Sequence, residues 1–169
     1  MQSEIKLPSK IFLEEFKGDF LRYFEAVYKI FKEDYVDSKP TYNGKELKLK
    51  KHPYIEGKEY TFYHLTHSGK IETDRKPDLR RMERIAWSKP IIENGNIWGL
   101  KIWPQKRNGK NRICIWLEAE NDLDYIVILD VRINYSLIWT AFVLEYSHEK
   151  RKKQREYNTY LKSKNRLNN

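Results

Sequence analysis

The sequence predicts an α+β protein in which N-terminal helices are followed by a four-stranded antiparallel meander sheet and then a C-terminal helix. Four consecutive runs between Asn96 and Tyr146 are rich in Ile, Val, Trp, Tyr and Leu and end at turn residues, which is typical of strands. Phenylalanines recur at helical spacing near the N-terminus, and a basic run follows the last strand. We place one domain at 37–163, an N-terminal helix within 1–36 and a frayed tail at 164–169.

The clearest helix is expected from Ile11 to Phe31, because apolar residues recur there every three or four positions. They are Phe12, Phe16, Phe20, Phe24, Val27, Tyr28 and Phe31. Ser9 is a candidate N-cap. Gly18 predicts a close contact or a break, because Gly inside a helix costs about 1 kcal/mol relative to Ala. We favour packing of this stripe against the rest of the domain over a role in binding a partner.

A polar connector from Tyr35 to Pro53 follows, in which Glu46–Lys50 alternates like a short exposed strand. Its basic residues either contact phosphates or protect a sheet edge, and the sequence leaves both open. They are Lys45, Lys48, Lys50, Lys51 and His52. Lys58–Leu65 also alternates and predicts a strand that runs into a turn at Thr66–Lys70. His64 and His67 can then share a cleft only if this strand stops near Leu65.

A short helix is expected to start within the Asp74–Asp78 segment, which offers an acidic cap and a proline in the first turn. One face of this helix is apolar, with Leu79, Met82, Ile85 and Ala86, and Arg80, Arg81 and Arg84 lie off that face. The segment Trp87–Pro90 is expected to end the helix, and Gly95 to turn the chain into the sheet.

The sheet is predicted from four strands joined by short turns, which leave little room for a crossover helix. The strands are Ile97–Trp103, Arg112–Glu118, Asp124–Val131 and Ser136–Glu145. Asn108-Gly109 is the strongest hairpin signal among the turns. Ser147 is a candidate cap for a last helix from His148 to about Lys162, whose basic residues are Lys150, Arg151, Lys152, Lys153 and Arg155.

Composition favours a polyanionic partner such as nucleic acid or an acidic protein. The chain has 33 basic and 24 acidic residues, which gives a net charge of +9. No apolar run approaches the roughly 20 residues of a membrane span, and the N-terminal residues lack the apolar core of a signal peptide. We therefore expect a soluble cytoplasmic protein without a membrane partner. The one cysteine, Cys114, lies in an apolar strand and is interpreted as a buried, inert thiol.

The candidate site combines His64, His67, the arginine group and Thr140, with Tyr146 and His148 as outliers. If the short helix packs across the sheet, these groups meet near the last strand. Metal-free RNA cleavage requires such a set: a base for the ribose 2′-hydroxyl, an acid for the leaving 5′-oxygen, and cations for the phosphorane. Imidazoles can serve as base and acid at neutral pH, and arginine can bind two phosphate oxygens at once. The products would be a 2′,3′-cyclic phosphate and a 5′-hydroxyl.

These residues resemble a known family. The segment His64–His67, the Arg-bearing helix, the Ile91–Asn94 exit, the meander and Thr140 in the last strand are similar to the phage-associated branch of the barnase–EndoU–colicin–RelE-like (BECR) ribonuclease superfamily. The likeness covers roughly Thr61 to Tyr146. It implies helices before a four-stranded antiparallel sheet, cofactor-free and metal-independent endoribonuclease activity, and a toxin or phage-conflict role, with RNA and an antitoxin or inhibitor protein as partners.

By the matching positions, the resemblance implies catalytic roles for a set of five residues: His64, His67, Arg81, Arg84 and Thr140. Which histidine is acid and which is base stays open. The family's basic residue after the second histidine could be Lys70 or Arg75. We expect RNA to be bound by Arg80, Lys70, Lys150, Arg151 and Lys152.

Three alternatives remain. The chain could be a noncatalytic nucleic-acid-binding module that stacks bases on Tyr60, Tyr63, Trp98 and Trp103. It could be a phage- or plasmid-encoded protein-interaction domain that uses the phenylalanine stripe. A zinc site from His64, His67 and Asp74 is disfavoured, because the spacing lacks the pattern that makes a metal prediction specific.

Overall fold

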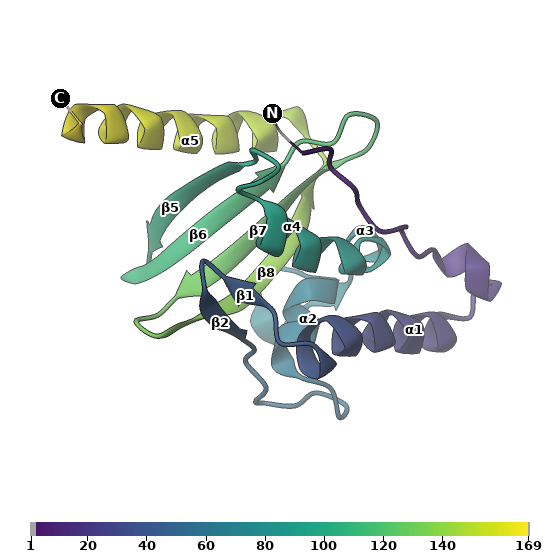
Figure 1. Cartoon of the computed structure of the whole chain (residues 1–169). Helices are drawn as coiled ribbons and strands as arrows, with labels where there is room; N and C mark the ends of the chain where they lie inside the picture. Colours follow the sequence, from purple (N-terminus) through teal and green to yellow (C-terminus); the bar gives the residue numbers. More distant parts are fainter. Residues whose placement is uncertain (1–2, 169) are drawn as a thin grey trace.

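The α+β class is confirmed by a computed structural model, which describes residues 3–168 (Figure 1). The sheet, however, has six strands and is mixed, in the order β1-β2-β8-β7-β6-β5. The strands are β1 Thr41–Tyr42, β2 Lys45–Lys48, β5 Lys101–Arg107, β6 Lys110–Leu117, β7 Asp124–Val131 and β8 Tyr135–Leu144. The four predicted strands are present as antiparallel neighbours, β5 to β8. The prediction that the sheet has only four strands is wrong. The hairpin β1–β2 extends it by pairing β2 parallel to β8.

The first strand of the meander starts and ends later than predicted, and the boundaries of β6 and β8 differ by one or two residues. Residues Ile97–Gly99 form a turn with Gly99 at a φ of 67°, so β5 begins at Lys101 and runs on to Arg107. The predicted hairpin turn is confirmed, because Asn108 and Gly109 have φ values of 51° and 73°. The register of β7 and β8 shifts between Ile128 and Leu129, where Trp139 is the extra residue of a bulge.

The predicted N-terminal helix is broken where Gly18 stands. A short 3-10 turn, η1 (Leu13–Phe16), ends at Lys17 and Gly18, whose φ values of 54° and 78° are left-handed. The main helix, α1 (Phe20–Lys32), begins after Asp19, whose side chain accepts a hydrogen bond from the Arg22 N–H. Asp19, and not Ser9, is therefore the N-cap. A π-helical turn, η2 (Glu33–Asp37), continues from α1.

The strand predicted over Lys58–Leu65 is wrong, because Tyr60–Thr66 form a helix, α2. Six of its seven residues are buried, so apolar residues surround it and no helical period can be read. After α2 the chain forms a two-stranded ribbon of β3 (His67–Ser68) and β4 (Lys76–Pro77), with a 3-10 turn, η3 (Glu72–Asp74), between them.

The next helical segment starts later and ends later than predicted. Asp78 caps α3 (Leu79–Glu83) by accepting a hydrogen bond from the Arg81 N–H. A 3-10 turn, η4 (Ile85–Trp87), leads into α4 (Ser88–Asn94). Pro90 therefore does not end the helix. It lies in the first turn of α4, where a backbone N–H has no intrahelical partner to lose.

Both faces of the sheet are covered, one of them only in part. The helices α1 to α4 pack on one face, where Phe24, Phe31 and Phe62 belong to the larger core cluster. The other face has a second cluster that includes Trp103, Trp116 and the buried Cys114, and Tyr157 of the last helix packs against it. Burial raises the pKa of the Cys114 thiol to about 11, which fits the predicted inert cysteine.

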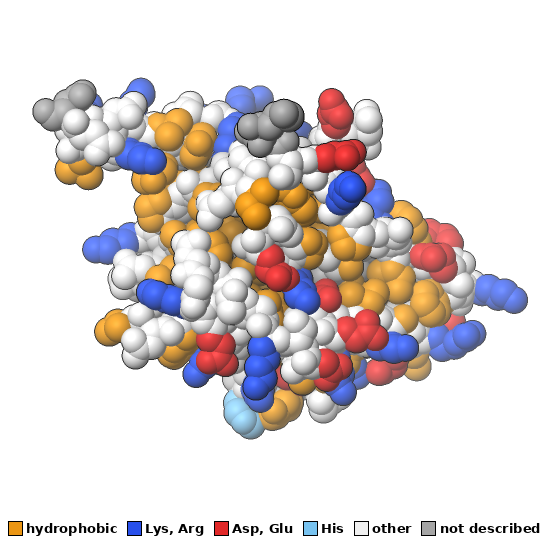
Figure 2. Space-filling view, in the orientation of Figure 1, with side chains coloured by type: hydrophobic (Ala, Val, Ile, Leu, Met, Phe, Trp, Pro, Cys, Tyr) orange, Lys and Arg blue, Asp and Glu red, His pale blue; other side chains and the backbone are white. Residues whose placement is uncertain are grey.

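The last helix, α5 (Ser147–Leu167), crosses one end of the sheet and continues past the edge strand β5 (Figure 1). Its N-cap is Tyr146 and not Ser147, and the Glu149 carboxylate accepts the backbone N–H groups of Glu145 and Tyr146. The helix runs past the predicted end at Lys162 and into the predicted frayed tail, whose last residue, Asn169, lies outside the described residues. None of the helices in residues 3–168 is long and apolar enough to cross a membrane. On the face seen in Figure 2, acidic and basic side chains are interspersed.

Candidate functional site

A cationic cavity of about 320 Å³ opens on the part of the sheet that α5 leaves uncovered. We call it the central cavity. Five of its lining side chains are basic: Arg75, Arg81, Arg107, Arg112 and Lys153. Its other lining residues are His64, Gln105, Asn108, Ile128, Trp139, Thr140 and Phe142. Since none of these is acidic, the cavity favours an anionic ligand.

The alternation of side chains along the strands places the cations. In β5, Gln105 and Arg107 lie two and four residues after Trp103 and so face the same side of the sheet. In β6, Arg112 is opposite Gln105 and precedes Cys114 by two residues. Helix α5 covers the apolar end of this face and leaves its polar end open. The same alternation that builds the second core cluster therefore also lines the central cavity.

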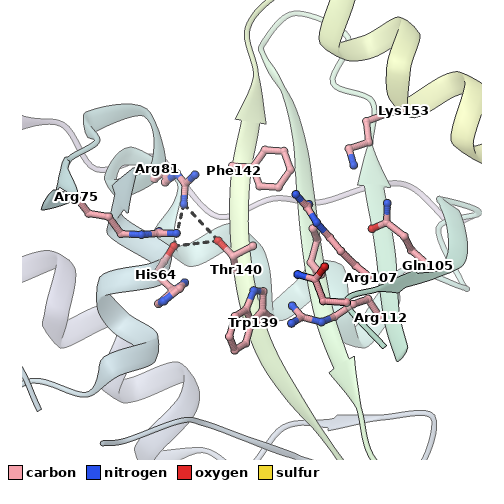
Figure 3. A pocket seen from close by; sticks show the side chains of 12 residues that line it. His64, Arg75, Arg81, Gln105, Arg107, Arg112, Trp139, Thr140, Phe142 and Lys153 are labelled. Atoms are coloured by element: carbon pink, nitrogen blue, oxygen red, sulfur yellow. Dashed lines mark hydrogen bonds between the residues drawn. The ribbon is translucent and has the colours of Figure 1, made fainter. Parts of the chain in front are cut away.

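Three of the five predicted catalytic residues meet at the wall of the central cavity (Figure 3). The main-chain carbonyl of His64 accepts hydrogen bonds from Arg81 Nη1 at 2.9 Å and from the Thr140 hydroxyl at 3.0 Å. Arg81 Nη1 also lies 3.3 Å from Thr140 Oγ1. These bonds join the end of α2 to β8. In this arrangement Arg81 Nη1 and the Thr140 hydroxyl hold the backbone of His64, while Arg81 Nε is buried and has no hydrogen-bond partner within residues 3–168.

The His64 imidazole lies at the edge of the cavity, between the Tyr60 and Trp139 rings, with centroid distances of 4.7 and 5.2 Å. Its Nε2 is 3.3 Å from a carboxylate oxygen of Glu72. Its Nδ1 is buried and has no hydrogen-bond partner within residues 3–168. One ring nitrogen is thus not engaged by the protein.

Burial, followed by repulsion from Arg75, Lys50, Arg81 and Arg112, lowers the pKa of His64 to about 4. The Glu72 carboxylate would favour the charged form, but its side chain is 61% exposed and its contact is long, so solvent screens it. His64 is therefore neutral at physiological pH and can accept a proton.

His67 lies outside the lining of the central cavity, so the two histidines do not share a cleft. The change from helix to strand between Thr66 and His67 turns its ring away, against Tyr63 and Phe24. Its Nδ1 is 2.9 Å from the Thr66 hydroxyl. Burial and the charge of Arg75 lower its pKa to about 4 as well. His67 has the environment of a packed structural histidine.

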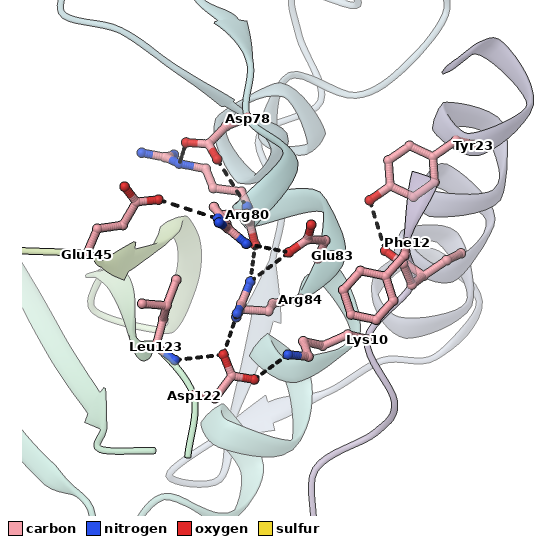
Figure 4. Close-up of polar contacts among 12 residues, drawn as sticks. Lys10, Phe12, Tyr23, Asp78, Arg80, Glu83, Arg84, Asp122, Leu123 and Glu145 are labelled. Carbon is pink, nitrogen blue, oxygen red and sulfur yellow. Dashed lines mark hydrogen bonds and ion pairs between the residues drawn. The ribbon is translucent and has the colours of Figure 1, made fainter. Parts of the chain in front are cut away.

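Arg84 also lies away from the central cavity, in a buried ion-pair network (Figure 4). Its side chain is only 2% exposed and contacts Asp122 at 2.5 Å and Glu83 at 3.1 Å. Asp122 in turn pairs with Lys10 of the N-terminal segment at 2.5 Å. Arg80 is exposed and lies 3.8 Å from both Glu83 and Glu145. Neither arginine lines the cavity, which corrects their predicted convergence with His64.

The predicted RNA-binding lysines are also dispersed. Lys70 does not line the central cavity, whereas Arg75, the alternative that the sequence left open, does. Lys150 lies 3.5 Å from Asp124, Arg151 is exposed, and Lys152 lines a second groove near Trp103. Sequence reasoning missed eight lining residues, among them Gln105, Arg107, Arg112 and Lys153. Strand alternation counted outward from Trp103 and Cys114 would have found the first three.

The structure weakens two alternatives. Of the four proposed base-stacking rings, Tyr60, Trp98 and Trp103 are buried. Within residues 3–168 no group of three or more His, Cys, Asp or Glu side chains is arranged to hold a metal, so the zinc set of His64, His67 and Asp74 is not assembled. Three of the four proposed rings are therefore not an exposed stacking surface, and the proposed zinc ligands do not form a cluster within the described residues.

Comparison with known proteins gives no relative: no family model, curated protein or solved structure matches this chain. The resemblance to the BECR ribonucleases therefore depends on the residues described above alone.

Proposed function

We propose that this protein is a metal-independent endoribonuclease of the BECR type and that the central cavity holds the phosphate at which RNA is cut. One observation carries the proposal. A neutral imidazole, whose buried Nδ1 has no hydrogen-bond partner within residues 3–168, lies at the wall of a cavity that has five cationic side chains and no carboxylate. Such a site has a base for a hydroxyl proton and positive charge for a phosphorane.

In the proposed reaction His64 removes the proton of the ribose 2′-hydroxyl. The 2′-oxygen attacks phosphorus, the bond from phosphorus to the 5′-oxygen breaks, and the leaving oxygen takes a proton from water or from the Lys153 ammonium. The products are a 2′,3′-cyclic phosphate and a 5′-hydroxyl. The proton on His64 returns to solvent, and Lys153, where it is the donor, takes a proton back from solvent. An imidazole with a pKa near 4 is a weak base, but the charge of the developing phosphorane raises its basicity.

Two cations are the proposed ligands of the phosphate oxygens. The Arg112 guanidinium stacks on the Trp139 ring at 4.1 Å, and its Nε has no hydrogen-bond partner within the described residues. Arg107 forms no ion pair within residues 3–168. Because Arg81 and Thr140 are engaged with the His64 backbone, Arg107 and Arg112 replace the arginines of the short helix as the proposed phosphate ligands. A toxin role, with an inhibitor protein as partner, stays part of the proposal.

We expect the purified protein to cut single-stranded RNA in excess EDTA and to leave DNA of the same sequence intact, because the attacking group is the 2′-hydroxyl. The products, separated on a gel, should carry 2′,3′-cyclic phosphate ends. Replacing one ribose with deoxyribose should block cleavage at that position only. Cleavage that requires a divalent cation, or equal cleavage of DNA, would exclude this reaction.

The pH dependence of cleavage should differ from that of an ordinary histidine base. A group with its pKa at about 6.5 loses about tenfold of its rate when the pH falls to about 5.5, because it becomes protonated. His64, with a pKa of about 4, stays neutral there. We therefore expect kcat/KM to be flat from pH about 8 to about 5.5 and to fall only near pH about 4. Initial rates across this range, on protein shown by circular dichroism to remain folded, measure it. A midpoint near pH about 6.5 would contradict the assignment.

A second candidate function is RNA binding without cleavage. It is favoured by the hydrogen bonds of Arg81 Nη1 and the Thr140 hydroxyl, which these two groups make to the His64 backbone. Both functions predict binding that weakens with salt, so only turnover separates them.

A further inference from the structure

A second groove of about 510 Å³ lies between the edge strand β5 and α5. We call it the α5 groove. The wall from β5 consists of Trp103, Pro104 and Gln105. The wall from α5 consists of Lys152, Arg155, Glu156, Thr159, Tyr160 and Ser163. These helical residues recur every three or four positions, so they form one stripe that faces the strand.

The charge of the α5 groove favours an anion. Lys152 and Arg155 make no ion pair within residues 3–168. The one carboxylate of the groove, Glu156, is already engaged, because its Oε2 accepts from Lys153 Nζ and from Gln105 Nε2, both at 3.2 Å. Two cations without ion-pair partners in the described residues therefore border the groove. The negative charge of Glu156 is neutralised by Lys153, which lines the central cavity.

The groove also has groups suited to a planar, polar ring. Trp103 is 2% exposed, and its indole Nε1–H is a buried donor without an acceptor in the described part of the chain. An unpaired buried donor is costly, so a ligand oxygen that reaches it would be favourable. The Tyr160 ring offers a stacking surface, and the hydroxyls of Thr159 and Ser163 lie along the same stripe.

The α5 groove adjoins the central cavity through one side chain. Gln105 lines both, and Lys153 of the central cavity is the neighbour of Lys152 of the groove on α5. A strand that has one phosphate in the central cavity can therefore continue over Gln105 and along α5. The ligand would carry phosphates for Lys152 and Arg155 and a base for Trp103 and Tyr160.

We propose that the α5 groove is a second nucleotide-binding subsite, which holds a nucleotide of the same RNA strand beyond the phosphate in the central cavity. The inference rests on the proposed function for its ligand. It assigns substrate binding to Trp103, Lys152, Arg155 and Tyr160, and it explains why α5 continues past the sheet edge.

The test compares fluorescently labelled 2′-O-methyl RNA of mixed sequence in two lengths. The longer probe, of about eight nucleotides, is within the site sizes of single-strand binders, and the shorter, of about two, is below them. These probes cannot be cut, because they lack the free 2′-hydroxyl. In the double variant Lys152→Ala/Arg155→Ala, the affinity for the longer probe should fall about tenfold, and the logarithmic salt slope should decrease by about 1.4, as expected for two lost phosphate contacts. Binding of the short probe should be unchanged. Fluorescence anisotropy measures both.

The matched control is Lys164→Ala/Arg166→Ala, which removes one lysine and one arginine from α5 at exposed positions that line neither the central cavity nor the α5 groove. The affinity of this control for the longer probe should fall by less than about threefold, because the substitutions change the net charge without removing a contact in the groove. Equal losses in the two double variants would overturn the subsite. Trp103→Phe, which keeps an aromatic ring and removes the N–H, should weaken only the longer probe, with an unfolding temperature measured to check the core.

The probes also separate this inference from the nuclease proposal. If the native protein fails to cut RNA while Lys152→Ala/Arg155→Ala still loses affinity for the longer probe only, that result would support the subsite and contradict the nuclease proposal. If the native protein cuts RNA in EDTA and the two double variants bind the longer probe equally well, the nuclease proposal is supported and the subsite is contradicted.

Discussion

Replacing His64 with Ala is expected to lower kcat for RNA cleavage by about 100-fold to 10,000-fold, the usual contribution of a general base. RNA affinity should stay within about threefold, because the cations of the central cavity remain. The fold should tolerate the change, since Arg81 and Thr140 bind the main-chain carbonyl of residue 64 and not its ring. Single-turnover rates in EDTA and binding to an uncuttable 2′-O-methyl RNA measure the two effects.

His67→Ala is the matched control for this experiment. His67 is also a buried histidine whose pKa is lowered to about 4, but it lies outside the central cavity. Its loss should reduce the unfolding temperature and leave kcat within about threefold, since cavity formation costs stability and not chemistry. If His67→Ala removes cleavage from a folded protein while His64→Ala does not, our choice of base is wrong.

Replacing Asp122 with Ala is expected to lower the free energy of unfolding by about 3 kcal/mol, because it leaves the buried Arg84 guanidinium short of a partner. Glu83 still contacts Arg84 in the variant. The loss of unfolding free energy is therefore expected at the lower end of the range for breaking a buried ion pair. The change also releases Lys10 and so the contact of the N-terminal segment with the β6–β7 loop (Figure 4). Urea unfolding at neutral pH measures the loss.

Asp74→Ala is the control, because Asp74 pairs with Lys76 at an exposed site and its loss should stay within about 0.5 kcal/mol. A second readout is acid unfolding. Although partial burial alone would raise the pKa of Asp122, hydrogen bonds from Lys10, Arg84 and the Leu123 N–H lower it to about 2. Its folded pKa is below its unfolded value, so its stabilisation is present above pH about 4 and is lost as the pH falls towards about 2. Asp122→Asn should remove this part of the acid sensitivity, and a network without energetic importance would leave both measurements unchanged.

The sequence predicted the elements whose residues repeat with a clear period. The strands from Lys101 to Leu144 and the break at Gly18 were readable because local spacing and turn residues define them. Helix α2 was not readable, since a helix buried on nearly all sides shows no period. The pairing of β2 with β8 was hidden for another reason. A short exposed strand does not encode which distant strand it joins.

The candidate site was half predictable for the same reasons. His64, Arg81 and Thr140 were selected by residue type and order along the chain, and the fold brings them together. Arg84 was selected with them because it carries the same charge on the same short segment. Only tertiary structure shows that Asp122 neutralises it in the interior. The sequence shows which side chains are charged, whereas tertiary packing determines the residue with which each charge pairs.

The walls of the central cavity come from a stretch of chain that begins at His64 and ends at Lys153. Its last cation is supplied by α5, which follows the final strand of the sheet. During synthesis from the N-terminus, the earlier segments emerge long before the residues that complete the cavity. If the proposed activity is correct, a nascent chain is inert until α5 has emerged from the ribosome as far as Lys153, and only then can it attack RNA.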